Sequence, residues 1–502
     1  MRNRRNLLLA FAIALALSAP VSAPAADTFK VILGETGNVS SRITASYKGS
    51  QGFGADIYLQ PCSASIKSDC ISSFSYQTQK GSEWLNLVPD EKILYPVAGV
   101  PRRNLNPDII PETLTVYAQD STKNFPAGGM SPVYRDANAT NDDGLRYLLN
   151  ARAQGSLGAE GVATWFDFRI EVIPVKISDY SKLNSFGFPN LQLQSTFQST
   201  TALKIQIKSK LTRGVLAGWF YGRIFQPEVR YTSFASDESL LEIIGSPITA
   251  HRVEGDVKLT DYSAIQSANQ SLLRPFAPGT SAMLFEPTYG FVNEAGAMKI
   301  WRLFNSYMGN SASTSYSVFS LRTTKNYSGN TNYYPQGCQS SQFLDGVVST
   351  NATMYNPIPP TYDANDGSLN FEVGSPHLDP SGKVIQGNYS MVVSAKLAKC
   401  IWGSDLTNSK ATVSIVNDSG TAQVTTSALK FLDDFYYFNV SGFTYSTKRI
   451  SIRLQPDPAP VVTPKPTPQV KTPVKRITCV KGNLKKYVSG VKPVCPKGYK
   501  IK

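Results

Sequence analysis

Between Thr201 and Tyr231 the chain reads TALKIQIKSKLTRGVLAGWFYGRIFQPEVRY. From Leu203 to Ile207 an apolar residue stands at every second position. A period of two is that of a β-strand with one buried and one wet face, whereas a helix would place apolar residues three and four positions apart. Residues 215–229 continue with aromatic and β-branched side chains, which favour strands. The stretch predicts a β-sheet protein and does not identify a reaction.

The length and composition of the chain predict several folded parts. Its 502 residues are too many for one ordinary core, so we expect two or three domains. Apolar residues make up 41% and charged residues 17%, which suits packed cores and argues against general disorder. The predicted fold class is mainly β: antiparallel β-sandwich domains with one or two short helices, a Pro-rich linker and a small disulfide-tied C-terminal module.

Patterning along the chain divides it into segments. Seven of the 21 residues from Pro456 to Arg476 are proline, a composition typical of an extended, semi-rigid spacer. The expected segments are a signal peptide at 1–26, a large β-rich domain at 27–325 with a subdomain split near 180, a C-terminal β-sandwich domain at 326–455, the Pro-rich linker at 456–476 and a small basic disulfide module at 477–502.

Local periodicity predicts a few elements in more detail. Residues 145–151 and 166–172 alternate, which predicts a long hairpin, and residues 389–397 are expected as a strand of the later β-domain. A helix is predicted from Asn293 to Gly309, with the two end residues as caps. Its apolar stripe comprises Ala297, Ile300, Trp301, Phe304 and Met308.

The formal charge of +14 is concentrated at the two ends of the chain. Residues 1–26 carry +3 and residues 456–502 carry +10, which leaves +1 for residues 27–455. The basicity is therefore a property of the tail. A high overall pI of this kind does not indicate a nucleic-acid-binding fold, and we expect no nucleic-acid partner.

The N-terminus has the pattern of a secretory signal peptide. Arg2, Arg4 and Arg5 precede the apolar run 7–17, and small residues follow at 23–26. The alternative is a retained anchor, but the run is shorter than the roughly 20 residues that span a bilayer. We expect a mature protein that is secreted or associated with the cell wall and has no transmembrane segment.

Six cysteines follow the predicted signal peptide. Export makes disulfides the expected state. Zinc is disfavoured because no pair has the C-x-x-C spacing and no histidine lies nearby in sequence. Local spacing predicts the pairs Cys62–Cys70, Cys479–Cys495 and, from the two that remain, Cys338–Cys400.

Two polar stretches are candidate binding sites. An oxygen-rich stretch could hold calcium, although its spacing does not fit an EF-hand and such residues also dominate turns. A later loop holds three tyrosines among amides, where exposed rings could stack on sugars or instead lie down on the domain. The calcium candidates are Asp136, Asn138, Asp142 and Asp143, and the ligand-binding candidates are Tyr327, Tyr333 and Tyr334.

Catalytic motifs are absent from the sequence. No G-x-S-x-G, H-E-x-x-H or P-loop pattern occurs. Of the two histidines, His377 has a carboxylate, Asp379, two positions away and is the better catalytic candidate, but a surface turn is the competing interpretation. A carboxylate pair for glycoside hydrolysis leaves no local signature that would select it. No cofactor is expected.

Four stretches of the sequence, DCISS at 69–73, GWFYGR at 218–223, GSPHLDP at 374–380 and AKCIW at 398–402, resemble an uncharacterised family of secreted actinobacterial proteins. The ending ITCVKG at 477–482 with CPKGY at 495–499 is similar to a short tail module of other exported actinobacterial proteins. The resemblance implies export and a β-rich body and transfers no catalytic residue.

Two functions from different classes follow as hypotheses. The favoured one is a binding or structural protein at the cell envelope, whose basic tail associates with anionic wall polymer or glycan. The alternative is a secreted hydrolase of glycans or esters with His377 in a loop-built cleft. An enzymatic role is the less favoured of the two.

Overall fold

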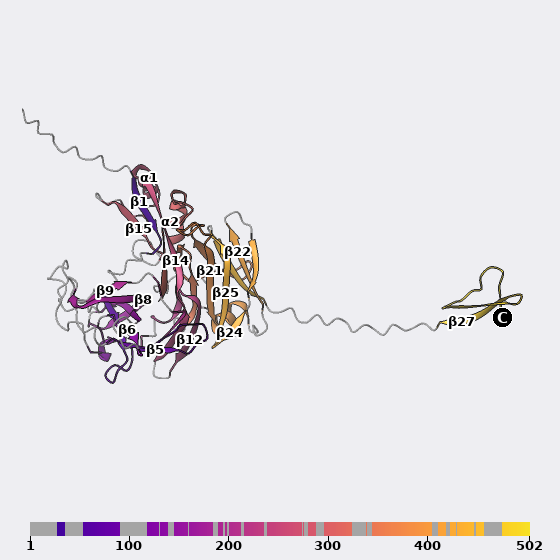
Figure 1. Cartoon of the computed structure of the whole chain (residues 1–502), viewed down its shortest axis with the longest axis horizontal. Helices are drawn as coiled ribbons and strands as arrows, with labels where there is room; N and C mark the ends of the chain where they lie inside the picture. Colours follow the sequence, from indigo (N-terminus) through magenta and orange to yellow (C-terminus); the bar gives the residue numbers. More distant parts are fainter. Residues whose placement is uncertain are drawn as a thin grey trace, which may run out of the picture. The chain divides into compact units, whose positions relative to one another are not determined.

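The computed structural model places most of the chain (Figure 1). It describes residues 28–35, 54–90, 118–129, 131–138, 145–158, 160–183, 189–193, 196–197, 200–211, 215–234, 238–273, 275, 280–287, 296–323, 338, 344–403, 410–417, 422–427, 429–445, 448–455 and 474–502. The chain forms two compact units, Met1–Gln455 and Pro456–Lys502. We call the first unit the body and the described residues 474–502 of the second the terminal module.

The described strands belong to three sheets, and the fold is mainly β as predicted. The largest sheet has 20 strands: β1 (Thr28–Leu33), β2 (Gly54–Tyr58), β3 (Gln60–Pro61), β4 (Cys70–Gln77), β5 (Leu85–Pro89), β6 (Val133–Asp136), β7 (Arg146–Leu157), β8 (Ala163–Leu183), β9 (Pro189–Leu193), β10 (Ala202–Ser209), β11 (Gly218–Arg223), β12 (Phe225–Ser233), β13 (Ser239–Ser246), β14 (Ile248–Lys258), β15 (Ala282–Phe285), β16 (Thr314–Thr323), β17 (Leu344–Thr350), β21 (Gln386–Ser394), β24 (Lys430–Leu432) and β25 (Phe435–Thr444).

The two smaller sheets contain the remaining strands. The second sheet also belongs to the body, and the third is the whole regular structure of the terminal module. The second sheet comprises β18 (Met354–Tyr355), β19 (Thr361–Asp363), β20 (Ser368–Gly374), β22 (Lys410–Asn417), β23 (Ala422–Ser427) and β26 (Lys448–Gln455), and the third comprises β27 (Lys475–Lys481), β28 (Leu484–Gly490) and β29 (Lys500–Ile501).

Strand β10 has the one-sided burial that its alternation predicts. Leu203, Ile205 and Ile207 are fully buried, while the residues between them are partly exposed. Antiparallel pairing with β4 and β13 fixes the strand on both sides. The buried residues point into what we call the first core, which also contains Phe74, Leu149, Ile170, Val229, Leu241 and Tyr437.

Strand β11 behaves differently, because both of its faces are buried. Phe220 lies in the first core, whereas its neighbours Trp219 and Tyr221 lie in a second core on the opposite face. The same division occurs in β17, where Val347 and Val348 point into different cores. A strand that is buried on both faces has apolar residues at consecutive positions, which explains the aromatic run WFY within GWFYGR.

The body therefore contains three successive layers. The strands β11, β17, β21 and β25 form the middle one, and β21 and β25 pair along nearly their whole length (Figure 1). The sheet of β4, β10 and β13 covers the first core, and the sheet of β20, β22 and β26 covers the second. The second core also contains Phe371, Val373, Val413, Ile450 and Ile452.

Strands from both sides of residue 325 pair with each other. Strand β11 runs parallel to β17, with Trp219 opposite Gly346 and Tyr221 opposite Val348. The described residues on the two sides of the expected boundary at 325/326 thus share one sheet within one compact unit. Parallel pairs also join β1 to β15 and β3 to β4, so the sheets are mixed as well as antiparallel.

Three α-helices occur among the described residues: α1 (Leu259–Ala268), α2 (Ala297–Phe304) and α3 (Ala395–Trp402). The predicted stripe of α2 is buried in a third core with residues of α1, β1, β14 and β15. The helix begins at Ala297 with Gly296 as N-cap, and a 3₁₀ turn, Asn305–Tyr307, follows it. The N-cap makes no side-chain hydrogen bond. The predicted cap Asn293 lies outside the described residues.

The strand predicted at residues 389–397 is wrong in its last part. Strand β21 ends at Ser394, and α3 begins at the next residue. The hydroxyl of Ser394 accepts a hydrogen bond from the backbone N–H of Leu397 at 3.3 Å, which is the N-capping arrangement that starts a helix. Leu397 and Ala398 then pack into the second core, so apolar residues continue through a change of element.

Candidate functional site

The two members of the proposed catalytic pair, His377 and Asp379, make different contacts in the structure. The side chain of His377 is exposed, and no hydrogen bond or ion pair joins it to Asp379. The carboxylate of Asp379 instead closes a turn, because its Oδ1 accepts from the hydroxyl of Ser381 at 2.7 Å and from the backbone N–H groups of Ser381 and Lys383. These bonds, that to the Ser381 hydroxyl first, hold the pKa of Asp379 below its usual value.

The calcium candidates are only partly within the described residues. Asp136 uses both carboxylate oxygens on the protein: Oδ2 accepts from the Tyr76 hydroxyl at 2.7 Å, and Oδ1 accepts from the backbone N–H of Asn138 at 2.9 Å. No group of three or more acidic, histidine or cysteine side chains suited to a metal occurs in the described part of the chain. Asp142, Asp143 and the candidate tyrosines Tyr327, Tyr333 and Tyr334 lie outside the described residues.

The cysteines form the three disulfides that spacing predicted. The bridges close loops of very different length, with sequence separations of 8, 62 and 16 residues. The second bridge fixes Cys338 to helix α3, against the second core. The pairs are Cys62–Cys70, Cys338–Cys400 and Cys479–Cys495.

A buried charge that the sequence analysis missed lies at the end of β11. The guanidinium of Arg223 is completely buried and donates through Nε to the carboxylate of Glu35 at 3.2 Å. Its remaining nitrogens donate to the backbone carbonyls of Thr350, Ala352 and Thr353. Burial is the largest single effect and lowers the pKa of Arg223, but the carboxylate of Glu35 and the nearby Tyr355, Tyr316 and Tyr445 together outweigh it, so that the pKa is raised.

His251 is the histidine with an unusual environment. It is 6% exposed, and its Nδ1 lies 2.8 Å from the hydroxyl of Ser315 on the paired strand β16. Burial, opposed by Asp379 and aided by Arg223, lowers the pKa of His251 to about 4. The imidazole is therefore neutral at neutral pH.

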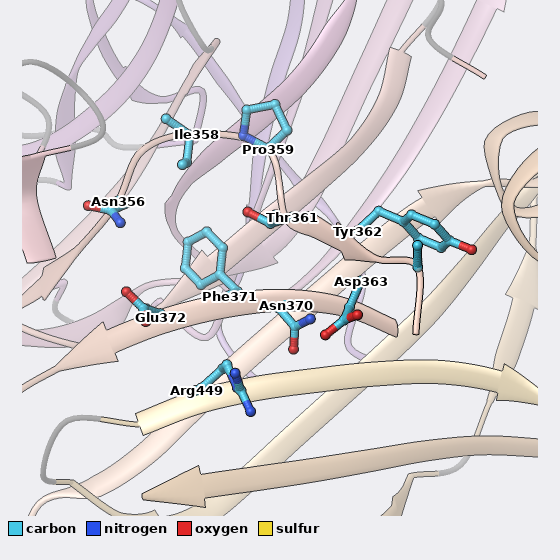
Figure 2. Close-up of a pocket in the computed structure, with 11 residues that line it drawn as sticks. Asn356, Ile358, Pro359, Thr361, Tyr362, Asp363, Asn370, Phe371, Glu372 and Arg449 are labelled. Carbon is cyan, nitrogen blue, oxygen red and sulfur yellow. The ribbon is translucent and has the colours of Figure 1, made fainter. Parts of the chain in front are cut away.

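A pocket of about 460 Å³ opens at the edge of the second sheet (Figure 2). Strand β20 pairs with β18 at Val373 and Gly374 and with β19 from Ser368 to Asn370. Residues 356–360 connect β18 to β19 and include three prolines. They pass Phe371 and Glu372, the two positions of β20 that pair with neither β18 nor β19. Proline has no N–H for a ladder bond, so the chain leaves the sheet here and returns at β19.

The pocket combines an apolar side with a polar one. Ile358 and Pro359 come from the excursion, and Phe371 lies between them and the strand that carries the polar residues (Figure 2). Antiparallel pairing places Glu372 opposite Arg449 and Asn370 opposite Ser451 on the outer face. The polar lining residues are Asn356, Thr361, Asp363, Asn370, Glu372 and Arg449.

The terminal module presents a different surface. Its described residues 474–502 contain nine lysines and arginines and no acid. All nine are exposed: Lys475, Arg476, Lys481, Lys485, Lys486, Lys492, Lys497, Lys500 and Lys502.

The strand register of the terminal module sorts its cations onto two faces. Residues opposite one another in an antiparallel pair share a face. Val480 lies opposite both Lys485 and Lys500, and Arg476 shares their face two pairs along β27. The guanidinium of Arg476 stacks over the ring of Tyr487 at 4.4 Å on this same face. The other face carries the buried Cys479 and its bridge to Cys495.

Comparison with known protein families, curated proteins and solved structures finds no match to the chain. The resemblance to secreted actinobacterial proteins remains a prediction. Among the described residues, no helix is both long and apolar enough to span a bilayer. The disulfides are compatible with an oxidising compartment outside the cytoplasm.

Proposed function

We propose that this protein is exported and acts as a binding protein at the cell envelope, where the terminal module associates with an anionic wall polymer. The observation that carries the proposal is the set of nine exposed cations, without one acid, on the terminal module. Residues 27–455 carry a net charge of only +1, so the positive field comes mainly from the tail that contains the module. Such a field attracts a polyanion without needing a shaped pocket.

The architecture of the terminal module supports a binding role more than an enzymatic one. Only Cys479 among its described residues is buried, so the module has no core that could shape a catalytic cleft. The face with Arg476, Lys485 and Lys500 is one side of a three-stranded sheet, and these three side chains are exposed. An exposed row of cations suits an extended polymer with repeated negative charges.

The first test compares the full chain with a variant that lacks residues 457–502. Each is applied to dextran sulfate beads and to neutral dextran beads, and to an isolated wall fraction. The proposal expects the full chain to be retained by the sulfated beads and the wall, with elution by salt, because exposed charges are screened within about 10 Å at 0.1 M ionic strength. Equal retention of the shortened chain would contradict the role of the terminal module.

A charge-matched pair of variants then asks which face binds. Arg476→Gln, Lys485→Gln and Lys500→Gln together remove three charges from one face of the sheet. Lys475→Gln, Lys481→Gln and Lys486→Gln remove three from the face that carries the disulfide. The first triple variant should elute at distinctly lower salt than the second, although their net charges are the same. Identical elution would show that total charge alone governs retention.

A further inference from the structure

The pocket at the edge of the second sheet belongs to the body and has no part in the proposed polymer contact. Its volume of about 460 Å³ lies within the range of small-molecule sites, roughly 300–1,000 Å³. The proline-containing excursion 356–360 opens it by leaving two positions of β20 without an edge partner. The hollow is thus encoded in the sequence rather than left by poor packing.

The charges around the pocket balance. Among the lining residues, Asp363 and Glu372 supply two carboxylates and Arg449 supplies a guanidinium. Arg302, which is not a lining residue, forms an ion pair with Glu372 at 2.9 Å and supplies the second positive charge. A balanced set gives no net attraction for an anion or a cation. The ligand that suits it is therefore neutral and rich in hydrogen-bonding groups.

The lining side chains are suited to hydroxyl groups. Carboxylates accept, guanidinium groups donate, and the amide of Asn370 does both. The hydroxyl of Ser451 bonds to Asn370 Oδ1 and fixes the orientation of that amide. Across the pocket, Ile358 and Pro359 offer an apolar wall (Figure 2). A sugar ring has polar hydroxyls on its edge and C–H groups on its face, so it matches both sides.

We propose that this pocket, bounded by residues 356–361 and by Asn370, Glu372 and Arg449, binds a neutral saccharide. The ligand class differs from that of the terminal module, which recognises negative charge. The two sites would let the protein hold an anionic polymer with one unit and sample neutral sugars with the other. Each of the two proposals can fail without the other.

The test uses the full chain and a panel of neutral oligosaccharides: cello-, chito-, malto- and galacto-oligomers. Saturation-transfer NMR and calorimetry are carried out in 0.5 M NaCl, where the roughly 4 Å Debye length suppresses contacts of the terminal module. At least one oligomer series should bind. Absence of binding by all four would overturn the proposal.

Matched variants then locate the binding. Arg449→Ala should weaken it on the order of tenfold, the effect of losing one hydrogen bond from a charged group. Arg453→Ala is the control, because Arg453 lies four residues along the same strand and is exposed but does not line the pocket. Equal affinity of the two variants would overturn the assignment of the site.

A second variant keeps every hydrogen-bonding group except one exposed hydroxyl. Thr361→Trp places a bulky ring at the pocket mouth, on an exposed position of a short edge strand that tolerates aromatic residues. It should change the affinity for the saccharide, by filling the mouth or by stacking on the sugar ring, without lowering the melting temperature. An affinity equal to that of the wild type in a folded Thr361→Trp variant would also contradict the site.

Discussion

At the scale of single residues, Arg223 shows why the phrase GWFYGR has a polar end. Its charge is surrounded by one carboxylate and three backbone carbonyls, from segments 188 and about 130 residues away in the chain. The side chain therefore joins β11 to the chain that follows β17 and to Glu35. A buried ion pair of this kind is costly to break, because the surviving charge has no partner.

Arg223→Met should destabilise the body by about 3–5 kcal/mol, since Glu35 is 5% exposed and would lose its partner. The measurement is urea unfolding followed by tryptophan fluorescence. Arg230→Met is the control: the side chain of Arg230 is 53% exposed although it pairs with Glu242 and Asp433, so its loss should cost less than about 1 kcal/mol. Similar losses in the two variants would contradict the structural role of Arg223.

The lowered pKa of His251 predicts that the free energy of unfolding of the body depends on pH. Its pKa is lowered from 6.5 to about 4 by burial, so the unfolded chain binds the proton first as pH falls. The contribution of His251 to the free energy of unfolding is complete above pH 6.5. It decreases as the pH falls towards 4, by up to about 3 kcal/mol. His251→Asn removes this titration and keeps a polar group facing Ser315.

The measurement is the urea midpoint of the wild type and of His251→Asn at several pH values across this window. The variant should lose distinctly less stability on acidification than the wild type does. His377→Asn, which alters an exposed side chain, is the control for removing one histidine. An unchanged slope in His251→Asn would contradict the assignment.

Residue-level prediction from the sequence succeeded where the partners are close in the chain. The bridges Cys62–Cys70 and Cys479–Cys495 follow from short spacing, and Cys338–Cys400 follows by elimination. At Asp379 the carboxylate accepts hydrogen bonds from its own turn, and a catalytic role with His377 stays a prediction. The Arg223 and His251 contacts lie across strands far apart in sequence, where periodicity carries no information.

At the scale of elements, the pattern of apolar residues predicted whether a segment is a strand or a helix better than it predicted where the element ends. Alternation placed β10 correctly because one of its faces is wet. The apolar run through Leu397 hides the change from β21 to α3, since both elements bury residues in the second core. The pocket depends on where three prolines interrupt an edge strand, and such an interruption is readable only once the partner strand is known.

The terminal module depends on its disulfide for its fold. Its strands contribute little buried apolar area, and Leu484, Tyr487 and Ile501 are about 60% exposed. The bridge Cys479–Cys495 closes a loop with a sequence separation of 16 residues, which is worth about 3 kcal/mol in the chain-entropy model. A module of this size has little else to offset the entropy of folding.

Cys479→Ser with Cys495→Ser should therefore unfold the terminal module and leave the body intact. The measurement is limited proteolysis with mass spectrometry, where cleavage within residues 475–502 should become rapid. Cys62→Ser with Cys70→Ser is the control for losing one bridge, because that bridge lies in the body. A protease-resistant module in the absence of its bridge would contradict the dependence.

At the scale of the whole molecule, the middle layer decides how the body folds. Strands β11, β17, β21 and β25 give side chains to the first core from one face and to the second core from the other. Neither core is complete without strands from both sides of residue 325. Composition and periodicity predicted the sheets, but a shared layer is a long-range property that a single sequence does not reveal.

A fragment of residues 27–325 should therefore fail to fold alone. It would lack β17, β21 and β25, and it would expose Trp219 and Tyr221 on the bare face of β11. We expect a broad, noncooperative urea transition and binding of a hydrophobic dye, whereas the full chain unfolds cooperatively. The chain shortened to residues 27–455 is the matched control, because the body is a compact unit without the terminal module, and its transition should equal that of the full chain. A sharp transition in the fragment 27–325 would mean that the first core closes by itself and that the middle layer is an interface between two independent domains.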